Sequence, residues 1–285
     1  MVDAKYADKV VVITGAANGI GAQLARDYAA EGATLALADI DEPNLTAVAQ
    51  ELTADGVRLI SEVVDVADAD AVAAFAETTY EAFGRVDYCF SNAGVISVGA
   101  IWEEPLPDWE WLWGTNVMGT VHMIHAFIPR MTAQGEESHF ITTASIAGLL
   151  TVENSPSYVA SKFAALSLTE VLELQLQDAG SPVKAHAICP GIVKTDLMNC
   201  PRHRRPGTWD PDDPYFGSAD FTKRLAAATM SMEQVGIPVE EAVRTIIQGV
   251  DDGTFYILTH PAYNPAIVGR TQGIVDGVRP SKVRR

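Results

Sequence analysis

The sequence has few cysteines and few basic residues. Its three cysteines, Cys89, Cys189 and Cys200, lie far apart and form no CxxC pair. This spacing argues against a disulfide framework and against a zinc site, so we expect a reduced, cytoplasmic protein that holds no metal. Lys and Arg number 20 against 37 Asp and Glu, which gives a formal net charge of −17 at pH 7. Because this acidic excess repels nucleic acid and anionic membranes, neither is expected as a partner.

Long apolar runs are also missing. No run of about 18 consecutive apolar residues occurs, so no helix is expected to span a membrane. The first residues do not combine a basic region, an apolar run and a small-residue cleavage site, and a secretory leader is not predicted. The composition is 48% hydrophobic and 20% charged, which is typical of a folded protein with a substantial core.

Short β-branched apolar runs alternate with longer segments in which apolar residues recur every three or four positions. This alternation predicts a doubly wound, Rossmann-like α/β fold: a parallel sheet of about seven strands with helices on both faces and ligands at the carboxyl ends of the strands. The predicted strands are Val10–Thr14, Thr34–Asp39, Arg58–Val64, Val86–Ser91, His139–Ala144, Val183–Cys189 and Thr254–Thr259. The predicted helices are Gly19–Glu31, Glu42–Asp55, Asp68–Phe83, Asp108–Met131 and Ser157–Ala179.

We expect a single catalytic domain over residues 1–285, because the alternation resumes after its one interruption. That interruption, Asn199–Gly217, carries four prolines, two glycines and three arginines, and is predicted to form no regular element. Residues 196–235 are therefore predicted to be an inserted lid over the substrate. Residues 260–285 show weak periodicity and form a C-terminal extension whose place the sequence does not predict.

A glycine-rich turn, TGAANGIG over residues 14–21, follows the first predicted strand and opens the first helix. Gly15, Gly19 and Gly21 would let the backbone turn tightly and approach a pyrophosphate, while the helix N-terminus offers free N–H groups. Glycine-rich turns also arise for purely steric reasons, so this motif alone is a moderate indication of a dinucleotide site.

Asp39 indicates which dinucleotide would bind. It ends the second predicted strand, 18 residues after Gly21, where a carboxylate can accept hydrogen bonds from both ribose hydroxyls. A 2′-phosphate would meet like-charge repulsion there, and neither Ile40 nor Asp41 offers a compensating cation. The sequence therefore favours NAD over NADP. The alternative is that Asp39 caps the helix beginning near Glu42, although Asp41 could fill that role instead.

Tyr158 and Lys162 stand four residues apart on one face of a predicted helix. An ammonium beside a phenol lowers the pKa of the phenol from its usual value of about 10 and makes it a usable base. This spacing alone is a weak sign. Three further features fall in register with it, namely Asn92-Ala93-Gly94 after the fourth strand, Asn116 in the next helix and Ser145 at the end of the fifth strand.

Together these motifs resemble the short-chain dehydrogenase/reductase family, in its compact single-domain branch. The resemblance runs from about residue 8 to residue 196 and includes TGAANGIG, Asp65-Val66, NAG at 92–94, Asn116, Ser145, YVASK at 158–162 and PGIVKT at 190–195. It implies an NAD-dependent oxidoreductase that transfers a hydride between nicotinamide and a hydrophobic secondary alcohol or ketone.

The resemblance also implies a role for each catalytic residue. Tyr158 would exchange the proton with the substrate oxygen, and Lys162 would lower its pKa and hold the nicotinamide ribose. Ser145 would donate a hydrogen bond to the substrate oxygen, and Asn116 would support a water that links Lys162 to solvent. Thr143 remains an alternative to Ser145.

A second alternative to Ser145 is Ser155. The residues expected to contact the cofactor are Gly15, Asn18, Gly19, Ile20, Gly21, Asp39, Ile40, Asp65, Val66, Asn92, Ala93, Gly94, Tyr158, Lys162, Pro190, Gly191, Ile192, Val193 and Thr195. Among these, Asp65 and Val66 would lie against adenine, and Ile192, Val193 and Thr195 against the nicotinamide carboxamide.

The substrate side is less clearly marked. Arg202-His203-Arg204-Arg205 could recognise a substrate carboxylate or the cofactor pyrophosphate, or could be solvated or paired with the nearby Asp210, Asp212 and Asp213. The tryptophans that crowd one stretch could wall a substrate cleft or pack at a subunit interface. They are Trp102, Trp109, Trp111 and Trp113.

The long helices at Asp108–Met131 and Ser157–Ala179 are apolar enough to need burial on more than one side, so a homotetramer or homodimer is expected. Two other functions stay open. One is an NADP-linked biosynthetic ketoreductase, against which Asp39 speaks. The other is a dinucleotide-binding sensor without chemistry, against which the complete catalytic set speaks.

Overall fold

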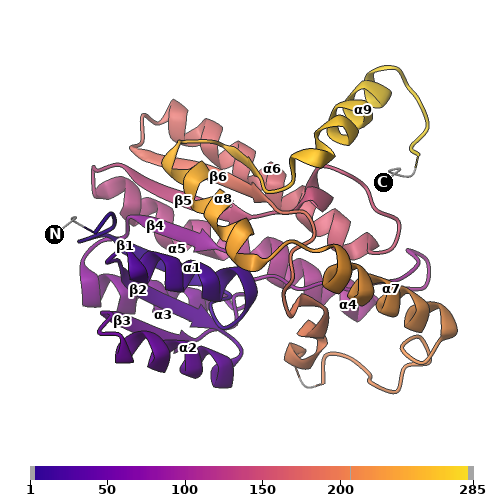
Figure 1. Ribbon diagram of the computed structural model, residues 1–285, viewed down its shortest axis with the longest axis horizontal. Helices are drawn as coiled ribbons and strands as arrows, with labels where there is room; N and C mark the ends of the chain where they lie inside the picture. The colour runs from indigo at the N-terminus through magenta and orange to yellow at the C-terminus, as the bar shows by residue number, and fades with distance from the viewer. Residues whose placement is uncertain (1–3, 206, 282–285) are drawn as a thin grey trace.

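A parallel sheet forms the centre of the structure, a computed structural model that describes residues 4–205 and 207–281. Within those residues the sheet has seven strands in the order β3-β2-β1-β4-β5-β6-β7, and every pairing is parallel (Figure 1). The predicted α/β fold is confirmed. The strands are β1 Val10–Thr14, β2 Thr34–Asp39, β3 Leu59–Val63, β4 Tyr88–Ser91, β5 Ser138–Thr143, β6 Val183–Cys189 and β7 Tyr256–Leu258.

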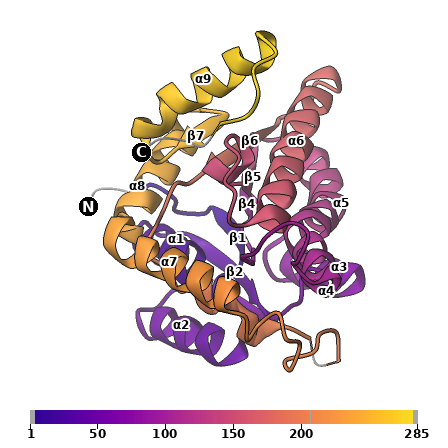
Figure 2. The same ribbon diagram turned by 90° about the vertical axis from the view of Figure 1, so that its right-hand side faces the viewer.

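Helices cover both faces of the sheet. One face packs against α1, α2 and α8, and the other against α3, α5 and α6, while α9 projects away from the sheet (Figure 2). The helices are α1 Gly19–Ala30, α2 Glu42–Ala54, α3 Ala69–Phe83, α4 Leu106–Leu112, α5 Gly119–Ala133, α6 Pro156–Asp178, α7 Ala219–Val235, α8 Val239–Asp251 and α9 Asn264–Val275. Among the described helices, none is both long and apolar enough to cross a membrane.

Two apolar cores, one on each face, explain why β1 consists entirely of apolar residues up to Thr14. Val11 and Ile13 point into the cluster beneath α1 and α8. Val10 and Val12 point into the cluster beneath α3 and α5. Since successive side chains of a strand point to opposite faces, a strand covered by helices on both sides must be apolar at every position.

The predicted helix over Asp108–Met131 is wrong as a single element. The chain forms α4, then a π-helical segment at Trp113–Met118, then α5. A π-helical turn holds one more residue than an α-helical turn, and such turns are common at functional sites. A recurrence of apolar residues every three to four positions in the sequence does not distinguish a π-helical turn from an α-helical turn.

Several other predicted boundaries are corrected. Asn199–Gly217 was expected to lack regular structure, but a 3₁₀ helix spans Leu197–His203. The extension after residue 260 forms a 3₁₀ turn at Pro261–Tyr263 followed by α9. Residues 282–285 of this extension and residue 206 of the predicted lid lie outside the described residues.

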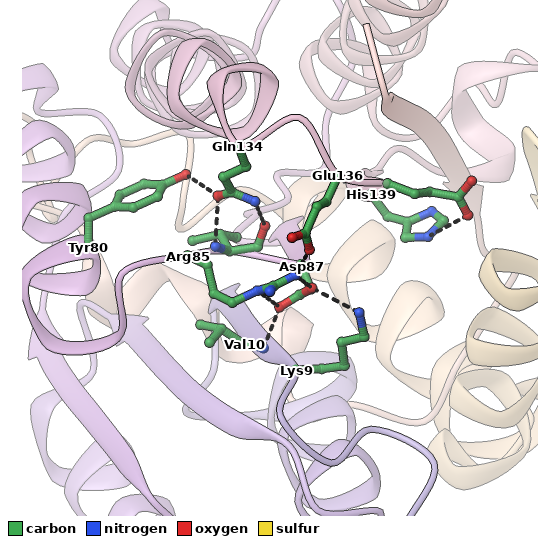
Figure 3. A network of polar contacts seen from close by, with 10 residues as sticks. Lys9, Val10, Tyr80, Arg85, Asp87, Gln134, Glu136 and His139 are labelled. Atoms are coloured by element: carbon green, nitrogen blue, oxygen red, sulfur yellow. Dashed lines mark hydrogen bonds and ion pairs between the residues drawn. The ribbon is translucent and has the colours of Figure 1, made fainter.

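A buried carboxylate ties β1 to β4 at the amino ends of these strands, opposite the carboxyl ends. Asp87 is 1% exposed, and it accepts hydrogen bonds from the Val10 N–H at 2.9 Å and the Arg85 Nε at 3.0 Å (Figure 3). Gln134 supports the same turn through both backbone groups of Val86. A buried charge is tolerated where charged and backbone donors surround it in this way, and we assign this network to stability.

Candidate active site

A cavity of about 800 Å³ lies where β1, β2, β4, β5 and β6 end. In doubly wound folds this edge is where ligands bind. Of the residues predicted from the sequence to form the site, Gly21 and Asn116 do not line the cavity, and all the others do. The structure therefore gathers into one place residues that are spread from position 15 to position 195.

The glycine turn forms a close-fitting cradle at one end of the cavity. Gly15 and Gly19 adopt φ values of +67° and +52°, which L side chains rarely take up. A Cβ at Gly21 would lie 1.9 Å from the Gly15 carbonyl oxygen, so no side chain fits. The Asn18 side chain does not cap α1, and the first N–H groups of that helix are left for a ligand. This geometry fits a dinucleotide pyrophosphate.

Asp39 is held in one orientation at the end of β2. Its Oδ2 accepts the Ala17 N–H at 2.8 Å, and its Oδ1 accepts the Asp41 N–H at 2.9 Å. The residue that caps α2 is Asp41, whose side chain accepts from Asn44. The alternative in which Asp39 caps that helix is therefore wrong. Instead, Asp39 joins the glycine turn to the end of β2 and faces the cavity.

The arginine cluster pairs mainly with acidic residues that are distant in sequence. Arg202 contacts Asp41 at 3.0 Å and the nearer Asp196 at 2.9 Å, and Arg205 contacts Asp65 at 2.5 Å. Burial lowers the pKa of His203, which lies 3.4 Å from Asp41. The 3₁₀ helix, which carries Arg202 and His203, thus closes over the end of the cavity where Asp39 lies.

The alternative in which the cluster pairs with Asp210, Asp212 and Asp213 is wrong for Arg202, Arg204 and Arg205, which pair with other carboxylates. Arg204 is 8% exposed and binds Asp108, at the start of α4. A sequence pattern favours neighbours in the chain as partners, whereas the pairs with Asp41, Asp65 and Asp108 join residues 96 to 161 positions apart.

Asn92 connects the glycine turn to the neighbouring strands. Its Nδ2 donates to the Thr14 carbonyl at 3.0 Å, and its Oδ1 accepts from the Thr143 hydroxyl at 3.0 Å. The Thr143 hydroxyl is therefore occupied in binding Asn92. That arrangement leaves Ser145, two residues further along, as the hydroxyl at the end of β5.

Tyr158 and Lys162 lie in the first turns of α6, and the Lys162 Nζ is 5.7 Å from the centre of the Tyr158 ring. Burial raises the pKa of Tyr158, and the Ser145 side chain lowers it. Burial lowers the pKa of Lys162 to about 8. Lys162 donates one hydrogen bond, 2.7 Å long, to the Thr143 carbonyl. An ammonium has three donors, so others are available to hydroxyl groups of a bound ribose.

Ser145 is oriented by the backbone around it. Its hydroxyl accepts the Ala147 N–H at 3.0 Å and lies 3.5 Å from the Pro190 carbonyl, to which it can donate. The second of these contacts is long, and the hydroxyl can rotate toward a substrate oxygen instead. Ser155, the other alternative, also lines the cavity and precedes α6.

Asn116 lies in the π-helical segment and is 2% exposed. Its side chain accepts from the Val95 N–H and donates to the Val95 carbonyl and the Ser161 hydroxyl, each at 2.9 Å. A Cβ at Gly94 would lie 3.3 Å from both the Asn116 Oδ1 and the Lys162 Nζ. Gly94 therefore leaves room for these two groups to approach one point.

Some cavity residues were not predicted from the sequence. In the C-terminal extension, His260 binds the loop that follows β6: its Nδ1 lies 3.2 Å from the Gly191 N and its Nε2 lies 3.1 Å from the Ile192 carbonyl oxygen. Tyr263 lines the cavity directly. The α7 residues Ala227, Ala228, Ser231 and Met232 line it too, and they lie within the predicted lid of residues 196–235. Weak periodicity around residue 260 gave no signal for this placement.

The tryptophans divide between two environments. Trp111 lines the cavity, whereas Trp102 is 82% exposed and Trp113 is 45% exposed. Trp111 also stacks on Arg204.

Among the described residues, no group of three or more His, Cys, Asp or Glu side chains is arranged to hold a metal ion.

Comparison with known proteins identifies relatives over nearly the whole chain. A "CLA biosynthesis dehydrogenase/reductase" of Lactiplantibacillus plantarum is 38% identical over 275 residues, covering 96% of each chain. A "1-deoxy-11-beta-hydroxypentalenate dehydrogenase" of Streptomyces avermitilis is 31% identical over 251 residues, covering 87% of this chain and 83% of that protein.

A solved structure is similar along its full length. It is that of a short chain dehydrogenase/reductase from Burkholderia phymatum in complex with NAD, with a TM-score of 0.94, 34% identity and complete coverage of both chains. The family model described as short chain dehydrogenase matches residues 9–205. The chain therefore belongs to the short-chain dehydrogenase/reductase family of oxidoreductases, which use a nicotinamide dinucleotide.

Proposed function

We propose that this protein is an NAD-dependent dehydrogenase that transfers a hydride between nicotinamide and a hydrophobic secondary alcohol or ketone. One observation carries the proposal: Tyr158, Lys162 and Ser145 converge at the cavity whose far end carries the cradle of glycines and Asp39. The NAD complex of the Burkholderia phymatum relative supports the choice of cofactor.

The four catalytic residues divide the work of moving a proton. In oxidation, the phenolate oxygen of Tyr158 takes the alcohol proton, and in reduction the Tyr158 hydroxyl gives its proton to the carbonyl oxygen. Ser145 donates to the same substrate oxygen and stabilises the charge that develops on it. The positive charge of Lys162 favours the phenolate form of Tyr158. Asn116 holds the backbone of Val95 and the hydroxyl of Ser161, the residue before Lys162. When bound, NAD supplies the carbon that accepts or releases the hydride.

The charges around the adenosine end support NAD over NADP. Asp39 faces that end together with three more carboxylates, which are Asp41, Asp65 and Asp196. Arg202 and Arg205 are the two guanidinium groups bound there, and both are already paired with these carboxylates. The balance is negative, and a 2′-phosphate would be repelled.

An apolar wall supports a hydrophobic substrate. Val95, Ile96 and Trp111 pack in one apolar cluster with Tyr158 and line the cavity. Leu150, Met198 and Met232 add further apolar and thioether side chains to the cavity lining. Such surfaces favour ligands with a large apolar area. The Streptomyces avermitilis relative is named for a hydroxylated pentalenate, which supports an alcohol of this kind.

We also infer that the protein forms a homotetramer or homodimer in the cytoplasm. Val171 and Leu174 of α6 are 48% and 61% exposed and leave an apolar stripe for a second copy. All three cysteines are free and buried, which supports a reducing compartment. Light scattering of the purified protein measures the assembly.

The test is a screen for formation of NADH, followed by its absorbance, with cyclic, aromatic and terpenoid alcohols. We expect turnover with NAD, and a much lower rate with NADP. In Asp39→Asn the ratio of kcat/KM for NAD to kcat/KM for NADP should fall about tenfold. One negative charge some 5 Å from a 2′-phosphate repels it by about 1 to 2 kcal/mol in a water-like dielectric, and the substitution removes that repulsion. Faster turnover with NADP by the unaltered enzyme would favour the biosynthetic ketoreductase. NADH binding without turnover of any alcohol or ketone would favour the sensor.

A further inference from the structure

A buried ion pair joins the predicted lid to the start of α4. Arg204 Nη1 and Nη2 bind the two oxygens of Asp108 at 2.5 and 2.8 Å, as a two-pronged pair. The side chains are 3% and 0% exposed. Ser97 also donates to the Asp108 Oδ2 at 2.7 Å. Pairs of this geometry are among the strongest and most directional hydrogen-bonded contacts in proteins.

Three aromatic rings enclose the Arg204 guanidinium. Its central carbon lies 4.3 Å from the ring centre of Trp111, 4.9 Å from that of Trp209 and 5.5 Å from that of Phe216. Trp209 and Phe216 belong to the lid, whereas Trp111 belongs to α4. The cation thus lies between rings from both parts of the chain, and each ring attracts it through the negative face of its π system.

Two further contacts tie the same lid residues to the segment that follows β4. The Cys200 Sγ bonds both backbone groups of Ile96 at 3.3 Å, and the Tyr215 hydroxyl donates to the Val98 carbonyl at 2.5 Å. The nearby Gly99 has no Cβ, which leaves room for the Tyr215 ring. Arg204 lies between these two anchors in the chain. It is therefore the central attachment of the described residues 197–205 and 207–217, which we call the lid segment (Figure 2).

The lid segment bounds both halves of the site. Leu197, Met198 and Cys200 line the cavity beside Ile96, and Arg202 reaches Asp41 at the adenosine end. A shift of the 3₁₀ helix that carries these residues would therefore widen the cavity itself.

The same polar cluster continues to the helix that carries Tyr158. Glu104 is 5% exposed and bonds the Ser157 hydroxyl at 2.6 Å, and Ser157 precedes Tyr158 in α6. Burial raises the pKa of Glu104, and the Asp108 charge raises it further. Arg204 supplies the positive charge that pairs with Asp108 in this cluster. If the lid segment moved away, Asp108 would remain buried without its cation, which is strongly unfavourable.

We propose that Arg204 and Asp108 are positioning residues that lock the lid segment over the cavity and thereby set the affinity for substrate. This proposal rests on the proposed function only in naming the site's substrate as an alcohol or ketone. The ion pair acts on the wall of the site and touches no reacting atom. Its loss should raise KM for the alcohol much more than it lowers kcat.

The first readout is limited proteolysis of the folded, full-length enzyme, which requires no substrate. Asp108→Asn keeps every arginine, so the same trypsin sites after Arg202 and Arg204 are present in all proteins compared. We expect cleavage there to become about tenfold faster. The matched control is Asp220→Asn, which breaks an exposed pair with Arg224 in α7 and should leave the cleavage rate unchanged.

The second readout is steady-state kinetics with the best alcohol from the screen. In Asp108→Asn we expect KM to rise about tenfold while kcat changes less than about threefold. A purely structural role would lower kcat in proportion to the folded fraction and leave KM unchanged. If Asp108→Asn does not fold, Trp209→Ala replaces it: it removes one ring and keeps the ion pair, and should speed cleavage roughly threefold.

The outcomes separate this proposal from the proposed function. Unchanged cleavage in folded Asp108→Asn, or in Trp209→Ala where it is the substitute, overturns the lock. Faster cleavage with an unchanged KM overturns its effect on substrate. An unaltered enzyme that oxidises no alcohol contradicts the proposed function, and the cleavage rates still decide whether the ion pair locks the lid segment.

Discussion

Replacing Asn116 by Ala should destabilise the protein strongly, even though the side chain does not line the cavity. The amide makes three hydrogen bonds of 2.9 Å, two of them to the backbone of Val95 and one to the Ser161 hydroxyl. Asn116 is 2% exposed and Val95 is 7% exposed. Water is therefore poorly placed to replace the lost bonds without a rearrangement of the chain.

The magnitude follows from the groups left behind. An alanine would leave the N–H and the carbonyl of Val95 and the hydroxyl of Ser161 without their partner. Each unsatisfied buried polar group destabilises by about 1 to 3 kcal/mol. Since the Ser161 hydroxyl also donates to the Tyr158 carbonyl at 2.8 Å and keeps that bond, its share falls at the lower end. We expect a total loss of about 3 to 5 kcal/mol in the free energy of unfolding.

Urea denaturation followed by circular dichroism measures this loss. The control is Asn199→Ala, the same truncation at an exposed residue with a single long side-chain contact, which should change stability by less than about 0.5 kcal/mol. A loss below about 1 kcal/mol in Asn116→Ala would refute the reasoning. Activity should fall as well, because Val95 lines the cavity and Ser161 directly precedes Lys162, which also lines it.

Two further predictions concern stability. Gly21→Ala places a Cβ 1.9 Å from the Gly15 carbonyl oxygen and 2.8 Å from the Asn92 Nδ2, so NADH binding and thermal stability should both be lost. Fluorescence titration measures the binding, and a melting curve measures the stability. Native-like values in both would contradict the cradle geometry. The second concerns pH. Burial and the neighbouring His186, 3.0 Å away, lower the pKa of His139 to about 4, and burial also lowers the pKa of His186. The histidines of the unfolded chain therefore take up protons below about pH 6.5, while the same rings in the native protein stay neutral. The stabilisation is complete above pH 6.5 and is lost between pH 6.5 and about 4, which a series of melting temperatures measures; a flat series over that window would rule it out.

Local chemistry explains what could be predicted from the sequence. The strands were found because a strand covered on both faces must be apolar throughout, as in β1. The glycine turn and the Tyr158–Lys162 pair were found because each is a short, contiguous motif whose spacing carries its geometry. Asp39 could be placed because it ends a strand next to that turn.

Long-range contacts explain what could not be predicted. Arg204 binds Asp108 across 96 positions, and no local pattern favours that carboxylate over the nearer Asp210 or Asp212. His260 reaches the loop at Gly191 only because β7 lies beside β6 in the sheet. Similarly, Asn116 in the π-helical segment binds the backbone of Val95, 21 positions away, and a helical periodicity does not reveal that contact.

The central claim is that Tyr158 exchanges the proton with the substrate. The most direct test is the turnover of Tyr158→Phe with the best alcohol, measured beside its affinity for NADH. The substitution removes only the hydroxyl, so we predict NADH affinity within about twofold of the unaltered enzyme and a kcat lower by a factor of about 10² to 10⁴, the usual contribution of a general acid or base. Turnover that survives at a comparable rate in Tyr158→Phe would contradict the account.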